Sequence, residues 1–202
     1  MRPDYHAVIL DRLPTDARSA LDVGCGTGAL TRRLRILVPD VVGIDRDQRC
    51  IESARAHPGA DAITYLAGDF LTWRCPPESF DVITSVASLH HMDTPMALRR
   101  MRDLLRPGGV LGIIGLARGS SPVDVALTVP AAIGVRWHAL RTAGRPTVAV
   151  DEYAAPVCWP PPTSYRDIRR LARLLLPGAR YRRHLYWRYS LVWAKPTASF
   201  PA

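Results

Sequence analysis

The sequence predicts an α/β domain built on a doubly wound, mostly parallel sheet. Three observations lead to this prediction. Short apolar runs alternate with helical patterns up to residue 116, and the first run leads directly into a glycine-rich turn. After a long connection, the chain closes with two β-rich runs typical of an antiparallel hairpin. Together they predict five parallel strands and a terminal hairpin, seven strands in one sheet.

The composition suits one packed domain covering residues 1–202. Hydrophobic residues make up 48% and charged residues 22% of the chain, which allows a core and excludes wholesale disorder. No apolar run approaches the roughly 20 residues that cross a bilayer, and the first residues lack a signal-peptide cleavage pattern. The four cysteines are scattered without a CxxC pair. We therefore expect a reduced cytoplasmic protein without a membrane span or a bound metal.

The charge is strongly positive but unusual in composition. Lys and Arg total 27 against 18 acids, for a net charge of +9. Lys195 is the only lysine, so the other 26 cationic residues are arginines. Selection for phosphate binding has no reason to exclude lysine. This favours a compositional bias over a nucleic-acid footprint, and a nucleic-acid partner is not expected.

The first elements are justified by apolar spacing and end signals. A short helix over 4–13 ends at Pro14, and a buried strand at 19–23 precedes the glycines. Leucines at helical spacing then mark a second helix, which ends before Pro39. A strand at 41–44 follows, and Asp47 can cap the helix that runs to Ala56.

The next elements complete the parallel part. The runs at 63–66 and 80–84 predict the third and fourth strands. Pro95 opens a helix that reaches Leu105, with Pro107-Gly108-Gly109 as its stop signal. Residues 110–116 are apolar throughout, as expected of a strand covered on both faces.

The pattern changes after the fifth strand. Residues 117–163 hold seven prolines and no clean strand, and a connection of this length is functional or mobile. A helix over 164–176 follows, capped by Thr163 or Ser164. The closing hairpin is expected to turn at Trp187-Arg188.

The glycine-rich turn at residues 24–28 is the most informative stretch. A strand that ends in closely spaced glycines before a helix lets the backbone approach a ligand at the sheet edge. A dinucleotide fits this geometry, and Gly24-x-Gly26-x-x-Ala29 satisfies a relaxed dinucleotide pattern. A second ligand class shares the geometry, and a tight turn without any ligand is the remaining interpretation.

Five motifs at ordered spacing decide between these classes: LDVGCGTGAL (21–30), GID (43–45), GDF (68–70), FDVITSVASLHHM (80–92) and LLRPGGVLGI (104–113). With them the chain resembles the class I S-adenosylmethionine-dependent methyltransferases of the small-molecule type. A dinucleotide site would want its third glycine one residue later, and the terminal hairpin also resembles this family. The resemblance implies a Rossmann-like sheet and S-adenosylmethionine as cofactor, with S-adenosylhomocysteine as product.

The resemblance also implies which residues bind the cofactor: Asp22, Gly24, Cys25, Gly26, Gly28, Asp45, Arg46, Gly68, Asp69, Phe70, Ser85 and Val86. The glycine backbone would lie against the methionyl part, which Asp22 would support. Asp45 would accept hydrogen bonds from both ribose hydroxyls, unless it is an ordinary helix cap.

Other positions carry open alternatives. Asp22 can instead bind local amides at the strand end. Asp69 would meet the adenine amine, while Phe70 would pack on the adenine or in the core. Arg46 would flank the adenine or stay in solvent. A backbone carbonyl of Ser85 or Val86 would hold the methionyl ammonium.

His90 and His91 are the candidate catalytic residues. A histidine with a pKa near neutrality can remove a proton from an acceptor oxygen or nitrogen. The two can equally pack at a helix start without a catalytic role. Methyl transfer from a sulfonium is an in-line displacement that mainly needs alignment and exclusion of water, so a base is optional.

Motifs that are missing from the sequence restrict the class of methyl acceptor. The signature runs of nucleic-acid amino methylases and base-carbon methylases are absent after the fourth strand, as are paired glutamates, clustered acids and convergent thiols. A small organic acceptor remains, a quinone precursor or a secondary metabolite. An RNA-directed methyltransferase and a non-catalytic cofactor-binding module are the alternatives.

The long connection is expected to serve the acceptor. Residues 117–163 leave the carboxyl end of the fifth strand, where an acceptor must enter. Trp137 and Trp159 would line its pocket, unless they only cover the sheet edge. A monomer or homodimer is expected.

Overall fold

The computed structural model describes residues 5–119, 160–184 and 187–197, and the statements below concern these ranges. No helix within them has the length and apolarity needed to span a membrane.

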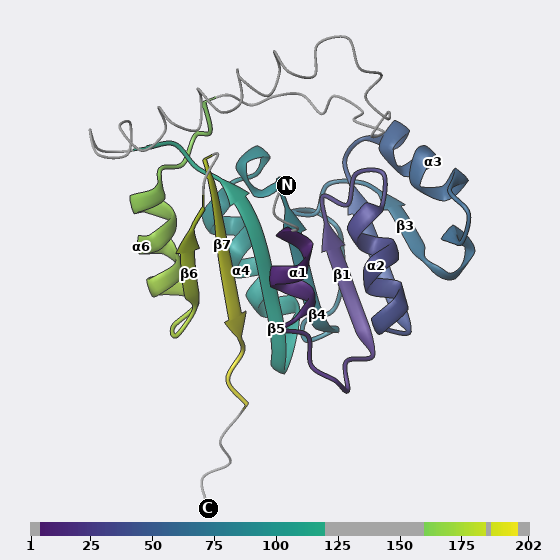
Figure 1. Ribbon diagram of the computed structural model, residues 1–202, viewed down its shortest axis with the longest axis horizontal. Coiled ribbons are helices and arrows are strands. Elements are labelled where there is room, and N and C mark those ends of the chain that lie inside the picture. Colours follow the sequence, from purple (N-terminus) through teal and green to yellow (C-terminus); the bar gives the residue numbers. More distant parts are fainter. Residues whose placement is uncertain (1–4, 120–159, 185–186, 198–202) are drawn as a thin grey trace, which may run out of the picture.

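One seven-stranded sheet forms the centre of the molecule (Figure 1). Its spatial order is β3-β2-β1-β4-β5-β7-β6. The neighbours among β1 to β5 are parallel, while β7 runs antiparallel to both β5 and β6. The predicted mostly parallel sheet with a C-terminal antiparallel hairpin is confirmed. The strands are β1 Ser19–Val23, β2 Asp40–Asp45, β3 Thr64–Ala67, β4 Phe80–Val86, β5 Leu105–Leu116, β6 Arg180–Arg183 and β7 Arg188–Ala194.

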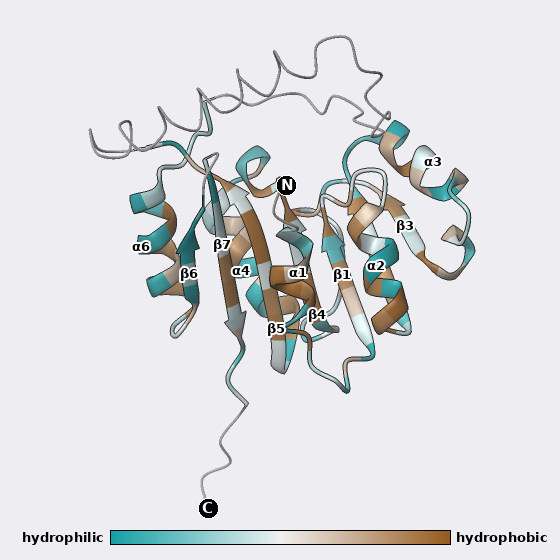
Figure 2. Cartoon of the chain, in the orientation of Figure 1, coloured by the Kyte–Doolittle hydropathy of each residue, from teal (hydrophilic) through white to brown (hydrophobic). Residues whose placement is uncertain are grey.

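Helices cover both faces of the sheet. The longer helical segments are α1 Tyr5–Leu10, α2 Ala29–Leu37, α3 Gln48–Ala56, α4 Thr94–Leu104 and α6 Tyr165–Leu175, and the short 3₁₀ turns are η1 Ala60–Ala62 and η2 Leu89–His91. One apolar cluster joins the sheet to α4 and α6, and a second joins it to α2 and α3. In Figure 2 the inner strand β5 is largely apolar, whereas α6 turns polar residues outward. The fold is therefore doubly wound, as predicted.

Helix starts follow local signals in the sequence. The Asp47 carboxylate accepts a hydrogen bond from the Arg49 amide at 2.9 Å, which confirms the predicted cap of α3. At α6 the cap is Ser164 rather than Thr163, because its hydroxyl and the Asp167 carboxylate form a reciprocal capping box.

Several boundaries differ from the predictions, chiefly around β5. Helix α4 ends at Leu104 and β5 begins at the next residue, so Pro107-Gly108-Gly109 lies inside a strand and not in a loop. The residue before a proline avoids helical backbone, which stops the helix early. Gly108 and Gly109 then exchange backbone hydrogen bonds with Lys195 and extend the strand.

Other ends move by one to three residues. Helix α1 stops at Leu10, and β3 and β4 end later than predicted, at Ala67 and Val86. In the hairpin, Arg188 is the first residue of β7 and pairs with Leu116 instead of forming the turn. Trp187 before it has a positive φ of 59°, which suits a turn position.

At the end of the strands opposite the glycine turn, the carboxylate of Asp81 joins neighbouring segments of the sheet. Asp81 Oδ2 accepts hydrogen bonds from the backbone amides of Arg18 and Ser19 and from the Ser19 hydroxyl, each at 2.9 Å. Its Oδ1 pairs with Arg106 Nη1 at 3.0 Å. Burial acts to raise the pKa of Asp81, but the hydrogen bonds from Arg106, Arg18 and Ser19 outweigh it and hold the pKa below the ordinary value of 3.8.

Asp81→Asn is expected to lower the free energy of unfolding by about 1–3 kcal/mol, because an amide nitrogen replaces an acceptor that serves several donors. Since the folded pKa is depressed, this stabilisation is complete above pH 3.8 and is lost as the pH falls through the lower folded value. Urea denaturation at several pH values measures it. Asp103→Asn removes an exposed pair with Arg102 and should change stability by less than about 1 kcal/mol. Equal effects of the two variants would contradict this role of Asp81.

Candidate functional site

The candidate site lies where the carboxyl ends of β1, β2 and β4 meet. The loop after β1 is tied to β2 by backbone hydrogen bonds, since the Gly24 and Cys25 amides both donate to the Ile44 carbonyl, at 2.8 and 3.1 Å. The Gly26 amide donates to Asp45 Oδ2 at 2.8 Å. These bonds fix the path of the loop along the sheet edge.

The three loop glycines have different reasons to be glycine. All have positive φ, of 71°, 53° and 81° in chain order. A Cβ on Gly24 would lie 2.2 Å from Ser88 Cβ, and one on Gly28 would lie 2.3 Å from the Tyr65 hydroxyl. A Cβ on Gly26 would meet nothing within 4 Å. Packing within the protein thus requires Gly24 and Gly28, whereas Gly26 borders open space.

Asp45 stands beside this open space at the end of β2. Its Oδ2 accepts from Gly26 and its Oδ1 accepts from the Asp47 amide at 2.9 Å. Each carboxylate oxygen has capacity for one further hydrogen bond. The helix cap of α3 is Asp47, so Asp45 is not used as that cap and can accept hydrogen bonds from a ligand.

Asp22 is a buried structural carboxylate. It is only 2% exposed, and its two oxygens accept from the hydroxyls of Thr31 and Thr84, at 2.7 and 2.8 Å. Burial raises its pKa to about 6, against the opposing effect of these hydroxyls. No sequence motif marks Thr31 or Thr84, although a hydroxyl at a core position of α2 or of β4 can indicate a buried polar partner.

The Cys25 side chain turns away from the open space. Its thiol lies in the core cluster beneath the loop, 3.0 Å from where a Cβ on Gly43 would sit. Burial, the first cause, raises the pKa of the thiol well above its ordinary value, and the charges of Asp22 and Asp45 add to this. Cys25 can therefore offer only its backbone to a ligand.

The residues after β3 divide between the site and the core. The Gly68 amide donates to the Asp45 carbonyl at 2.8 Å, and the Asp69 carboxylate accepts from the Leu71 amide at 2.8 Å. Phe70 is 3% exposed and packs in the core, with the Arg100 guanidinium 5.4 Å from its ring centre. Of the two interpretations of Phe70, the structure supports the core one.

The end of β4 combines buried hydroxyls with backbone strain. The Ser85 and Ser88 hydroxyls lie 2.6 Å apart, and Ser88 donates to the Val23 carbonyl at 2.8 Å. Val86, the last strand residue, is half-buried. Ala87 then adopts a positive φ of 53°, a conformation that costs roughly 1–3 kcal/mol in a non-glycine residue and concentrates at functional sites. No sequence signal marked Ala87.

His90 and His91 lie in η2, three and four residues after this strained residue. Their ring centres are 4.0 Å apart. Burial, with smaller contributions from His91 and Arg188, lowers the pKa of His90 to about 4. Burial and the exposed Arg46 lower the pKa of His91, while Asp45 opposes this. Both rings are therefore neutral at pH 7.

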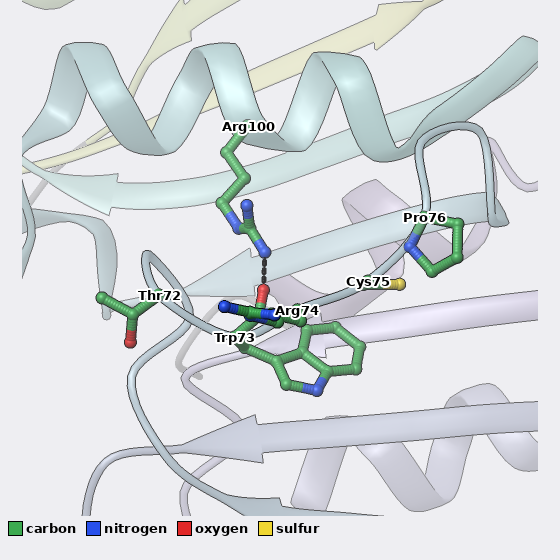
Figure 3. Close-up of a pocket in the computed structure, with 6 residues that line it drawn as sticks. All are labelled: Thr72, Trp73, Arg74, Cys75, Pro76 and Arg100. Carbon is green, nitrogen blue, oxygen red and sulfur yellow. Dashed lines mark hydrogen bonds between the residues drawn. The ribbon is translucent and has the colours of Figure 1, made fainter.

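Trp137 and Trp159, with most of the predicted 117–163 segment, lie outside the described residues. A hollow of about 450 Å³ lies between α4 and the connection after β3 (Figure 3). There the Arg100 guanidinium donates to the Trp73 carbonyl. The hollow is separate from the glycine loop and from the end of β4. It is lined by Thr72, Trp73, Arg74, Cys75, Pro76 and Arg100.

The chain is similar in sequence and in fold to several known proteins. Residues 20–109 match the profile of a family described as a methyltransferase domain. An uncharacterized methyltransferase of Mycobacterium tuberculosis is 36% identical over 202 residues, which cover 95% of this chain and 94% of that protein. An S-adenosylmethionine-dependent methyltransferase structure from Mesorhizobium loti superposes with a TM-score of 0.50 at 28% identity, over 55% of this chain and 52% of that one.

Two further relatives have more specific names. A ubiquinone biosynthesis O-methyltransferase of Cereibacter sphaeroides is 33% identical over 128 residues, 62% of this chain and 50% of that protein. A trans-aconitate 2-methyltransferase of Methylobacterium radiotolerans is 32% identical over 179 residues, 87% of this chain and 59% of that protein. The matches span only part of both proteins.

The His90 imidazole is expected to titrate with a pKa of about 4, so that it stays neutral through the range in which a solvated histidine gains its proton. Nuclear magnetic resonance of the ring carbons measures this value. His91→Gln should raise the pKa of His90 only slightly, because burial is the larger cause. A titration of His90 near 6.5 would show that its ring is solvated or hydrogen-bonded to an acid.

Proposed function

The chain belongs to the class I S-adenosylmethionine-dependent methyltransferases, and from this premise we propose that it methylates a small organic acceptor, a quinone precursor or secondary metabolite, by in-line displacement. The observation that carries the proposal is the juxtaposition of Gly26 and Asp45: open space beside the loop backbone, next to a carboxylate with unused acceptor capacity. The names of two relatives, for ubiquinone biosynthesis and trans-aconitate, also point to small molecules.

The residues at the sheet edge fit S-adenosylmethionine. Asp45 can accept hydrogen bonds from the two neutral ribose hydroxyls, a strong pairing for an ionised acceptor. We assign the adenine amine to the Asp69 carboxylate and one adenine ring nitrogen to the Phe70 backbone amide. The methionyl ammonium is assigned to a backbone carbonyl of Ser85 or Val86. Asp22 supports this site from below through Thr31 and Thr84.

The chemistry needs little from the protein beyond alignment. When bound, the cofactor supplies a methyl group already activated by the positive charge on its sulfur. The chain must hold the acceptor atom in line and keep water out. A pKa of about 4 makes His90 a weak base at neutral pH. We therefore assign proton acceptance to His91 and hydrogen bonding of the acceptor to His90.

Gly26→Ala is expected to weaken S-adenosylhomocysteine binding at least about tenfold, equivalent to about 1.4 kcal/mol, because the added methyl group enters the space assigned to the cofactor. Calorimetric titration measures the affinity. Gly59→Ala is the matched control, since Gly59 also has a positive φ and open surroundings. Each variant should lose roughly 1–2 kcal/mol of stability from left-handed backbone strain, but only Gly26→Ala should lose affinity. Equal affinities would remove Gly26 from the site.

The acceptor class is tested with S-adenosylmethionine labelled in its methyl group. We expect the protein to move the label into the small-molecule fraction of a cell extract and not into purified RNA, with heat-denatured protein as control. Label in RNA, with binding that weakens steeply with salt, would support the RNA-directed alternative. Cofactor binding without transfer to either fraction would support a non-catalytic binding module.

A further inference from the structure

We propose that the acceptor carries a carboxylate, and that this group is bound by the Arg188 guanidinium together with the Tyr5 hydroxyl and Nδ1 of His90. The inference rests on the proposed function, because it names the substrate class of the same site. None of these contacts was assigned by the motifs of the sequence, and each residue comes from a different element.

The three residues meet at the carboxyl edge of the sheet. Arg188 opens β7 opposite Leu116, the last residue of β5. The neighbouring strand β4 runs parallel to β5, with Val86 opposite Ile114, and η2 with His90 follows β4. Tyr5 begins α1, which packs on β5 through Ile9, 2.7 Å from where a Cβ on Gly112 would sit.

Direct contacts join Arg188, Tyr5 and His184. The Arg188 guanidinium carbon lies 5.0 Å from the centre of the Tyr5 ring, a cation–π contact. The Tyr5 ring packs edge-on against His184, with the ring centres 5.6 Å apart, and His184 Nε2 lies 2.8 Å from the Ser190 hydroxyl. The charge of Arg188 also acts on the His90 imidazole. Tyr5 is thus clamped between Arg188 and His184.

This cluster has buried polar atoms that lack hydrogen-bond partners. The Tyr5 hydroxyl and His90 Nδ1 are buried and have no hydrogen-bond partner. Within the described ranges, Arg188 forms no ion pair with a carboxylate. The titratable groups that act on His90 are His91 and Arg188, with no acid among them. A buried polar atom without a partner is costly, so the arrangement predicts a ligand that accepts hydrogen bonds from Arg188 and the Tyr5 hydroxyl, and from His90 in the tautomer that carries its proton on Nδ1.

The charge balance favours a carboxylate over a phosphate. Arg188 supplies the permanent positive charge beside Tyr5. Burial, aided by Arg188 at His90 and by Arg182 at His184, lowers the pKa of both imidazoles and keeps them neutral at pH 7. One guanidinium and two neutral donors match a monoanion, and the planar guanidinium fork suits the two oxygens of a carboxylate. A phosphate dianion would call for a second cation beside the Tyr5 hydroxyl, and the other guanidinium near the cluster, that of Arg182, acts on His184.

The experiment uses the full chain saturated with S-adenosylhomocysteine and three probes: benzoate, the neutral isostere benzamide, and phenyl phosphate. Ligand-observed nuclear magnetic resonance measures the dissociation constants. We expect benzoate to bind at least about tenfold more tightly than the other two, as a charged hydrogen-bonding pair implies. Arg188→Gln should weaken benzoate binding at least about tenfold, and Tyr5→Phe by about threefold.

The control variant is Arg180→Gln, because Arg180 is an exposed arginine on the adjoining strand β6. It should leave benzoate binding unchanged, and every variant should bind S-adenosylhomocysteine within about twofold of the wild type. Should Arg188→Gln fail to fold, Tyr5→Phe decides, since it removes one oxygen and preserves the ring.

Three results would overturn the inference: benzamide or phenyl phosphate binding as tightly as benzoate, benzoate binding that is insensitive to the variants, or no benzoate binding by a protein that still binds S-adenosylhomocysteine. In each of these the proposed cofactor-dependent function survives. Loss of S-adenosylhomocysteine binding by the wild-type chain would overturn both.

Discussion

The buried carboxylate of Asp22 is the constraint on which the site depends. It joins β1 to α2 through Thr31 and to β4 through Thr84, so the three elements that surround the glycine loop share one acceptor. Burial raises its pKa to about 6, which means that the folded state binds this proton more tightly than the unfolded chain does. The stabilisation from this group therefore declines as the pH rises from 3.8 through about 6. The hydrogen bonds from the Thr31 and Thr84 hydroxyls reduce the free-energy cost of burying the charged carboxylate.

Several residues around Asp22 are used for packing within the protein, and only a few groups are left for a ligand. Ser88 leaves no room for a side chain at Gly24, and Tyr65 leaves none at Gly28. The Phe70 ring packs in the core. Two features remain available to a ligand: the space beside Gly26 and the unused acceptor positions of the Asp45 carboxylate. A site of this kind is largely preformed, because the loop backbone is already held by β2 before a cofactor arrives.

The arginine-rich composition has a structural explanation in many of the described residues. Several guanidinium groups donate to backbone carbonyls, as Arg32 does to Thr27, Arg35 to Ala62 and Arg106 to Glu78. Their charges thus serve the ends of loops and strands. Arg188 differs from these three arginines because its guanidinium lies over the ring of Tyr5.

The sequence by itself determined the kind and order of the elements, the glycine loop and the cap at Asp47, because these follow from periodicity and from bonds between near neighbours. It located Asp45, yet not the open space beside it. Only the tertiary structure decided that Phe70 turns into the core, that Thr31 and Thr84 share Asp22, and that β5 begins at Leu105. Likewise, Tyr5 and Arg188 lie at opposite ends of the chain, and nothing local pairs them. Their contact exists because the antiparallel β7 returns to the end of β5, where α1 also packs.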